Sequence, residues 1–144
     1  MPRIDDGQHG TTGFQRLLGH NAAILAAWEH LEEVLISEGT LTPELKEQVR
    51  RVLAFGNGCE YCQAWGRAAD AHPDPKESLA VALAELMLQG PRDITDAQFD
   101  VLRSEFSDAE ISELLAWITF ITASQTIGAV LQLKPEPGQS QTAR

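Results

Sequence analysis

The stretch "LKEQVRRVLAFGNGCEYCQAWG", Leu45–Gly66, decides how the chain is organised. Apolar residues recur at helical spacing through its first half, which predicts an amphipathic helix. The letters "GNG" then end that helix, because glycine and asparagine tolerate the left-handed conformation found after a helix C-terminus. The only two cysteines of the chain follow at once, Cys59 and Cys62, three residues apart. A helix break directly before a CxxC pair is the feature that any functional interpretation has to explain.

Helical patterns continue on both sides of this stretch. Side chains suited to helix N-caps, often followed by proline or a capping-box partner, stand at Thr42, Asp74, Thr95 and Ser107. No alternating strand pattern survives outside helical periods. We therefore predict an all-α fold, a single-domain bundle of about six helices. The predicted helices cover about 20–37, from Pro43 to the "GNG" break, 59–71, from Pro75 to just before Gly90, a short helix with Phe99 and Leu102, and 108–132.

Both ends of the chain differ in composition from the helical part. Residues 1–12 are polar and are expected to be flexible, residues 13–133 form the predicted helical domain, and residues 134–144 form a Pro-, Gly- and Gln-rich tail expected to be disordered. The N-terminus has no apolar segment of the kind found in secretory signals, so a cytoplasmic location is expected. A stable structural disulfide is uncommon there, and a CxxC pair is more often catalytic or metal-binding.

The charge of the chain argues against two classes of partner. Its formal net charge is −10, whereas nucleic acids and anionic membrane surfaces attract basic proteins. The most apolar region, near Leu114–Val130, is interrupted by polar residues and is expected to be a buried helix and not a membrane span. We predict no nucleic-acid partner and no membrane association.

The position of the cysteines gives them chemistry. At a helix start, unpaired N–H groups and the helix dipole favour an anion, so a thiolate there has a lowered pKa. A structural zinc site would need two more ligands, and the sequence has neither a second CxxC nor a paired-histidine motif. No metal and no cofactor are predicted. A purely structural interpretation, two small apolar core residues, stays open.

Glu47 stands eleven intervening residues before Cys59, and the two cysteines complete an E-x₁₁-C-x-x-C pattern. With its flanking helices, this pattern resembles the AhpD-type alkylhydroperoxidases, including their peroxidase-related branch, of the carboxymuconolactone decarboxylase-like superfamily. The resemblance implies an all-helical homo-oligomer, a trimer or hexamer. It also implies that Cys62 attacks the peroxide, Cys59 resolves it as a disulfide, and Glu47 accepts a proton. The implied partners are a hydroperoxide or disulfide substrate and a dithiol reductant or reductase protein.

Gly66 departs from that pattern, which has a histidine four residues after the second cysteine. Close approach of another helix, room for a ligand or bulky neighbour beside Cys62, or loss of the proton relay would each explain the glycine. Glu47 could equally be a surface residue paired with Arg51 one helical turn on. The alternative to an enzyme is therefore a non-catalytic or redox-sensing helical oligomer of the same fold with a degenerate site. The non-redox decarboxylase branch is less favoured, because it does not rely on a CxxC pair.

Overall fold

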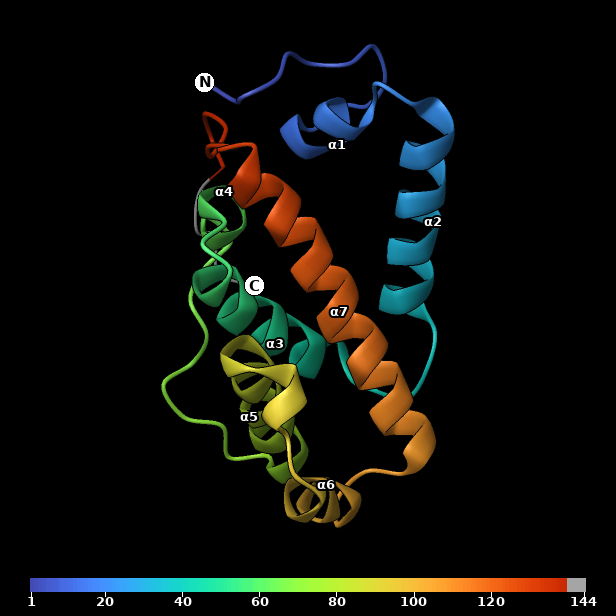
Figure 1. The fold of residues 1–144 in the computed structure, drawn as a ribbon, viewed down its shortest axis with the longest axis vertical. Coiled ribbons are helices and arrows are strands. Elements are labelled where there is room, and N and C mark those ends of the chain that lie inside the picture. Colours follow the sequence, from blue (N-terminus) through green and yellow to red (C-terminus); the bar gives the residue numbers. More distant parts are fainter. Residues whose placement is uncertain (140–144) are drawn as a thin grey trace.

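The computed structural model describes residues 1–139. Within that range the chain forms seven α-helices and one short 3₁₀ helix, with no strand (Figure 1). The prediction of an all-α single domain is confirmed. The elements are α1 (Gly13–Leu18), α2 (Ala22–Ser37), α3 (Pro43–Gly56), α4 (Glu60–Gln63), α5 (Pro75–Gln89), η1 (Pro91–Asp93), α6 (Asp96–Arg103) and α7 (Asp108–Val130).

Local capping explains where most helices begin. Thr42 caps α3 by accepting a hydrogen bond from the Leu45 N–H, and Asp74 caps α5 in the same way. Thr95 and Ser107 form full capping boxes at the starts of α6 and α7. These four starts agree with the sequence prediction. A further capping box at Thr12 begins α1, a helix that the sequence analysis did not predict.

The predicted helix over 59–71 is wrong. Only one turn forms, α4, and Gly66 has a φ of +114°, outside the helical region. The following backbone is held by side chains of α3. Gln48 Oε1 accepts the Ala69 N–H at 2.7 Å, and Arg51 Nη1 donates to the Arg67 carbonyl at 3.2 Å. Because α3 satisfies these backbone groups, the loop after α4 needs no further helical hydrogen bonds.

The core lies where α3 packs against α5 and α7 (Figure 1). Leu53, Leu83, Leu114 and Ile118 are among its most deeply buried side chains. Among residues 1–139, α7 alone is long and apolar enough to cross a membrane by length and composition. The central helix of a packed core meets the same criterion, and the buried residues of α7 favour that interpretation.

A buried ion pair fixes the connection between α2 and α3. Lys46 Nζ lies 3.2 Å from Glu113 Oε1 of α7 and also donates to the carbonyls of Leu35 and Glu38 at the end of α2. Glu113 also accepts the N–H of Thr40 at 3.0 Å. This cluster joins α2, α3 and α7.

Both ends of the chain are bound to the helical part, the C-terminal end at α4 and the N-terminal end just after α7. Lys134 Nζ lies 2.8 Å from Glu60 Oε1, and Gln139 Nε2 donates to the Tyr61 carbonyl at 3.2 Å. At the other end, the N–H of Arg3 donates to the Leu131 carbonyl at 2.9 Å. Flexibility of 1–12 and disorder of 134–144 stay predictions, and residues 140–144 lie outside the described part of the chain.

Candidate functional site

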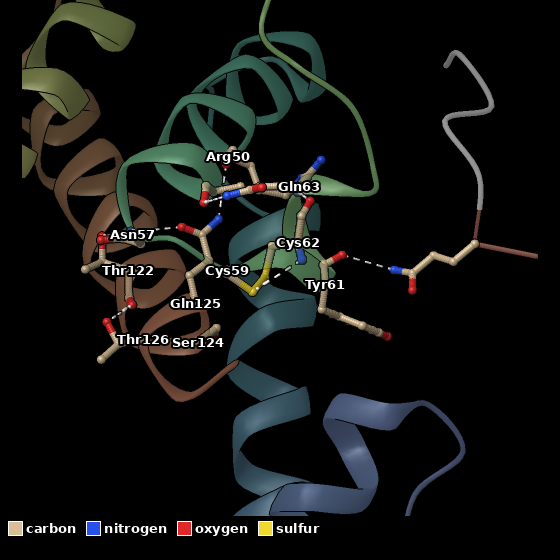
Figure 2. The surroundings of a disulfide bond; sticks show 12 residues. Arg50, Asn57, Cys59, Tyr61, Cys62, Gln63, Thr122, Ser124, Gln125 and Thr126 are labelled. Atoms are coloured by element: carbon tan, nitrogen blue, oxygen red, sulfur yellow. Dashed lines mark hydrogen bonds between the residues drawn. A yellow bond between two sulfur atoms is a disulfide. The ribbon is translucent and has the colours of Figure 1, made fainter. Parts of the chain in front are cut away.

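Helix α4 places the two cysteines against each other. Cys59 is the N-cap of α4, and its Sγ accepts the Cys62 N–H at 3.3 Å. The two residues form a disulfide with their Cα atoms 5.2 Å apart (Figure 2), within the usual range for such a bond. The predicted CxxC pair is therefore at bonding distance.

The two sulfur-bearing residues differ in exposure. Cys59 is 0% exposed, and it packs against Gly128 of α7. Cys62 is only half-buried and lines a pocket. Of the pair, Cys62 is thus the one that a reagent entering this pocket meets.

Gly128→Ala should perturb the oxidised protein. A Cβ at this position would lie 2.8 Å from Cys59 Sγ, and a disulfide sulfur cannot rotate away as a free thiol can. We expect the oxidised form to lose about 1–3 kcal/mol of unfolding free energy, the usual cost of overpacking a core, and the reduced form to lose less. Thermal unfolding with and without a dithiol reductant measures both values. An equal loss in the two forms would contradict the contact.

The pocket has a volume of about 460 Å³ and lies between α1, α2, α3, α4 and α7. Cys62 and Glu47 both line it, so two of the three predicted site residues share one cavity, while Cys59 lies behind the wall. Aromatic and apolar side chains make much of the remaining wall. The other lining residues are Thr12, Phe14, Gln15, Glu32, Arg50, Arg51, Tyr61, Trp65, Phe120, Ile121, Ser124 and Gln125.

Glu47 is tied to two arginines of its own helix. Its carboxylate accepts Nε and Nη2 of Arg50 at 2.8 and 2.7 Å, and Nε of Arg51 at 2.9 Å. Partial burial alone would raise the pKa of Glu47, but the hydrogen bonds and charges of the two arginines together lower it. Glu47 therefore stays ionised and binds a proton weakly near neutral pH.

The surroundings of Gly66 answer one question that the sequence left open. A Cβ there would lie 3.2 Å from Arg51 Nη1 and 3.3 Å from its Cζ, and the positive φ is itself unfavourable for other residues. Gly66 thus leaves room for the arginine that binds Glu47. Gly66 does not lie one helical turn after Cys62 on a shared helix face, because α4 has already ended before it.

Comparison of the structure with solved structures finds close matches over most of the chain. An uncharacterized peroxidase-related protein from Silicibacter sp. TM1040 matches with a TM-score of 0.77 and 18% identity, over 87% of this chain and 76% of that one. The alkylhydroperoxidase AhpD core of an uncharacterized peroxidase-related protein from Ralstonia eutropha JMP134 matches with a TM-score of 0.73 and 17% identity, over 86% and 76%. The chain has the AhpD-like fold. No protein-family model and no curated protein matches the sequence.

Within this AhpD-like fold, no histidine lines the described pocket. His20 Nε2 lies 2.7 Å from the Asp5 carbonyl oxygen, and His72 Nδ1 lies 2.7 Å from Glu77 Oε1. His9 and His30 are exposed. None of the four replaces the histidine of the resembled motif at the pocket wall.

Several residues of this site were not singled out from the sequence. Gln125 is 2% exposed, donates from Nε2 to the Arg50 carbonyl at 3.1 Å and accepts from Asn57 Nδ2 at 2.9 Å (Figure 2). The sequence signal that could have identified Gln125 was its place as a polar residue within the apolar part of α7. Tyr61 also lines the pocket, and burial raises the pKa of its hydroxyl.

Proposed function

We propose that this protein is a thiol-dependent peroxidase or disulfide oxidoreductase that works through Cys62 and Cys59. One observation carries the proposal: the two cysteines are at disulfide distance, with Cys62 on the wall of a pocket and Cys59 buried behind it. That asymmetry supports Cys62 as the attacking thiol and Cys59 as the resolving one. The AhpD-like fold is shared with peroxidase-related proteins, which agrees with this assignment.

Reduction of a hydroperoxide needs only the two cysteine thiols and one external dithiol reductant. The Cys62 thiolate attacks the outer oxygen of a hydroperoxide, the O–O bond breaks, and an alkoxide leaves and takes a proton. Cys62 is then a sulfenic acid. The Cys59 thiol attacks that sulfur, a disulfide forms and water leaves. A dithiol, small or on a reductase protein, restores both thiols by thiol–disulfide exchange.

The two arginines bound to Glu47 bear on its role as a proton acceptor. A proton acceptor works best when its pKa lies near the working pH, whereas two arginines lower the pKa of Glu47. Its place in the same pocket as Cys62 supports membership of the site. Its hydrogen bonds favour the task of holding the arginines over that of accepting the thiol proton.

The test is hydroperoxide consumption with a dithiol reductant in excess. Wild-type protein should consume the peroxide faster than the reductant alone, and Cys62→Ser should fall to that background. Cys59→Ser should still form a sulfenic acid at Cys62 in a single turnover, because serine is a good N-cap and preserves the start of α4. Equal steady-state rates for wild type and Cys62→Ser would refute the proposal.

A homo-oligomer, trimer or hexamer, is part of the proposal, and α2 supports it. This helix leaves large apolar side chains exposed along its length, among them Ile24, Leu31, Val34 and Ile36. Its residue Glu32 lines the pocket, so a second subunit covering α2 would also narrow the entrance to Cys62. Light scattering of the purified protein measures the mass of the assembly, and a monomer would contradict this part.

The second candidate is a redox-sensing protein of the same fold with no peroxidase turnover. The absence of a histidine from the described pocket wall favours it. In that case Cys59 and Cys62 would form and lose their disulfide without catalysing peroxide consumption. The assay above separates the two candidates, because only an enzyme turns over many equivalents of peroxide.

A further inference from the structure

The pocket wall beside Cys62 carries a cationic cluster that the reaction above does not use. Arg50 and Arg51 are consecutive residues of α3, and both line the pocket. Glu47 is hydrogen-bonded to both, and all three of these contacts are between 2.7 and 2.9 Å. One carboxylate between two guanidinium groups leaves the cluster with one net positive charge.

Of the two arginines, Arg50 is the one that is hydrogen-bonded to Cys62. Its Nη1 donates to the Cys62 carbonyl at 3.1 Å (Figure 2). Its Nε and Nη2 both donate to Glu47. A guanidinium has five N–H donors, and these contacts use three. Two remain without a protein partner among residues 1–139, on a side chain that is only 16% exposed.

The backbone of Arg50 is held as firmly as its side chain. Its carbonyl accepts Nε2 of the buried Gln125 at 3.1 Å, which ties this turn of α3 to α7. The neighbouring Arg51 keeps its place because Gly66 has no Cβ to displace it. The cluster is therefore fixed from three directions, by α3, α7 and the loop after α4.

The other charged groups around Cys62 are few. Helix α2 contributes Glu32 to the wall, and burial together with the charge of Glu29 raises the pKa of Glu32. Helix α4 contributes Tyr61 to the wall, whereas its Glu60 does not line the pocket and pairs with Lys134. Helices α1 and α7 contribute no charged residue to the lining. Among these groups, only Arg50 has a direct hydrogen bond to the Cys62 residue.

We propose that Arg50, positioned by Glu47, keeps the Cys62 thiol ionised near neutral pH, because it brings its positive charge and a spare N–H donor to the pocket wall that it shares with Cys62. An adjacent arginine stabilises a thiolate, and an opposite charge within a few ångströms typically shifts a pKa by about one to three units. Arg50 thereby supplies by charge part of what a histidine supplies in the resembled motif. Glu47 is a positioning residue in this scheme, and its lowered pKa keeps it in the ionised form that holds Arg50.

This inference rests on Cys62 as the attacking thiol, and its test needs no peroxide. In a Cys59→Ser background, Cys62 is the only thiol of the chain. The pH dependence of its alkylation by iodoacetamide gives its pKa directly. We expect a value at least one unit below the ordinary 8.5 of a free cysteine.

In the same background, Arg50→Met should raise that pKa by at least about one unit and slow alkylation at pH 6 about tenfold. Arg50→Lys keeps the positive charge but loses the two parallel hydrogen bonds to Glu47. The pKa of Cys62 in this variant should therefore lie between those of the parent protein and Arg50→Met. Arg103→Met is the matched control, because Arg103 is an exposed arginine of α6 that pairs with Asp100 and Asp108. It should leave the alkylation profile unchanged.

An ordinary pKa for Cys62 in the parent protein would overturn the inference without any arginine variant, and so would unchanged profiles in both Arg50 variants. Failure of the proposed function is a separate result. A protein that consumes no hydroperoxide but shows the Arg50-dependent pKa refutes the enzyme and supports the inference. A protein that consumes hydroperoxide, but in which the pKa of Cys62 does not depend on Arg50, supports the enzyme and refutes the inference.

Discussion

Lys46→Ala should lower the free energy of unfolding by about 3–5 kcal/mol, because removing one partner of a buried ion pair leaves the other charge without compensation. Lys46 and Glu113 side chains are 4% and 16% exposed, and Lys46 also donates to two carbonyls that end α2. Since small proteins are stable by only about 5–15 kcal/mol, this loss is large. Urea unfolding of the oxidised protein measures it.

Lys76→Ala is the matched control. Lys76 pairs with Glu110 at a similar distance, 2.9 Å, but its side chain is 40% exposed. An exposed pair contributes at most about 1 kcal/mol, so this variant should lose far less. Similar losses in the two variants would show that burial does not decide the strength of these pairs.

The same cluster predicts a pH dependence. Burial alone would raise the pKa of Glu113, but hydrogen bonds from Thr40, Lys46 and Leu41 together lower it below its ordinary value of 4.5. A folded-state pKa below the unfolded one means that this stabilisation is complete above pH 4.5 and is lost as the pH falls through the folded value. Glu113→Gln should therefore remove part of the loss of stability below pH 4.5, which urea unfolding across that range measures.

Local signals explain why much of the fold could be predicted from the sequence. The caps at Thr42, Asp74, Thr95 and Ser107 act on N–H groups within three residues, so the sequence alone contains the whole interaction. The disulfide partners are likewise three residues apart. The capping box at Thr12 is equally local and was available as a signal for α1.

The errors come from interactions across the chain. The helix predicted over 59–71 ends after one turn, where Gln48 and Arg51 bind backbone groups 21 and 16 residues away. The sequence of the loop itself does not show that these α3 side chains compete with helical hydrogen bonds for its backbone groups. Arg50 was missed for a related reason: three residues after Glu47 it has the spacing of an ordinary surface pair, and only the folded chain brings it to Cys62.

Gly66→His, which restores the histidine of the resembled motif, should reduce stability and turnover together. The φ of +114° at this position is one that other residues rarely adopt, and its Cβ would lie 3.2 Å from Arg51 Nη1. Strain of this kind costs about 1–3 kcal/mol. A shift of Arg51 would also disturb its hydrogen bond to Glu47, so we expect kcat/KM for hydroperoxide to fall, not rise.

Gly58→His separates the two causes. Gly58 also has a positive φ, +68°, but a Cβ there would meet nothing within 4 Å. This control should carry the smaller cost of a left-handed φ and keep the contacts of Arg51. Its thermal stability should therefore fall less than that of Gly66→His, while the pKa of Cys62 stays near that of wild type. If Gly66→His instead raises kcat/KM, the expectation is wrong. An imidazole at position 66 can then reach the reacting atoms, and the fold can hold the proton relay of the resembled motif. If turnover falls in Gly66→His and not in Gly58→His, the arginine cluster requires glycine at position 66, and the departure from the motif is part of the site.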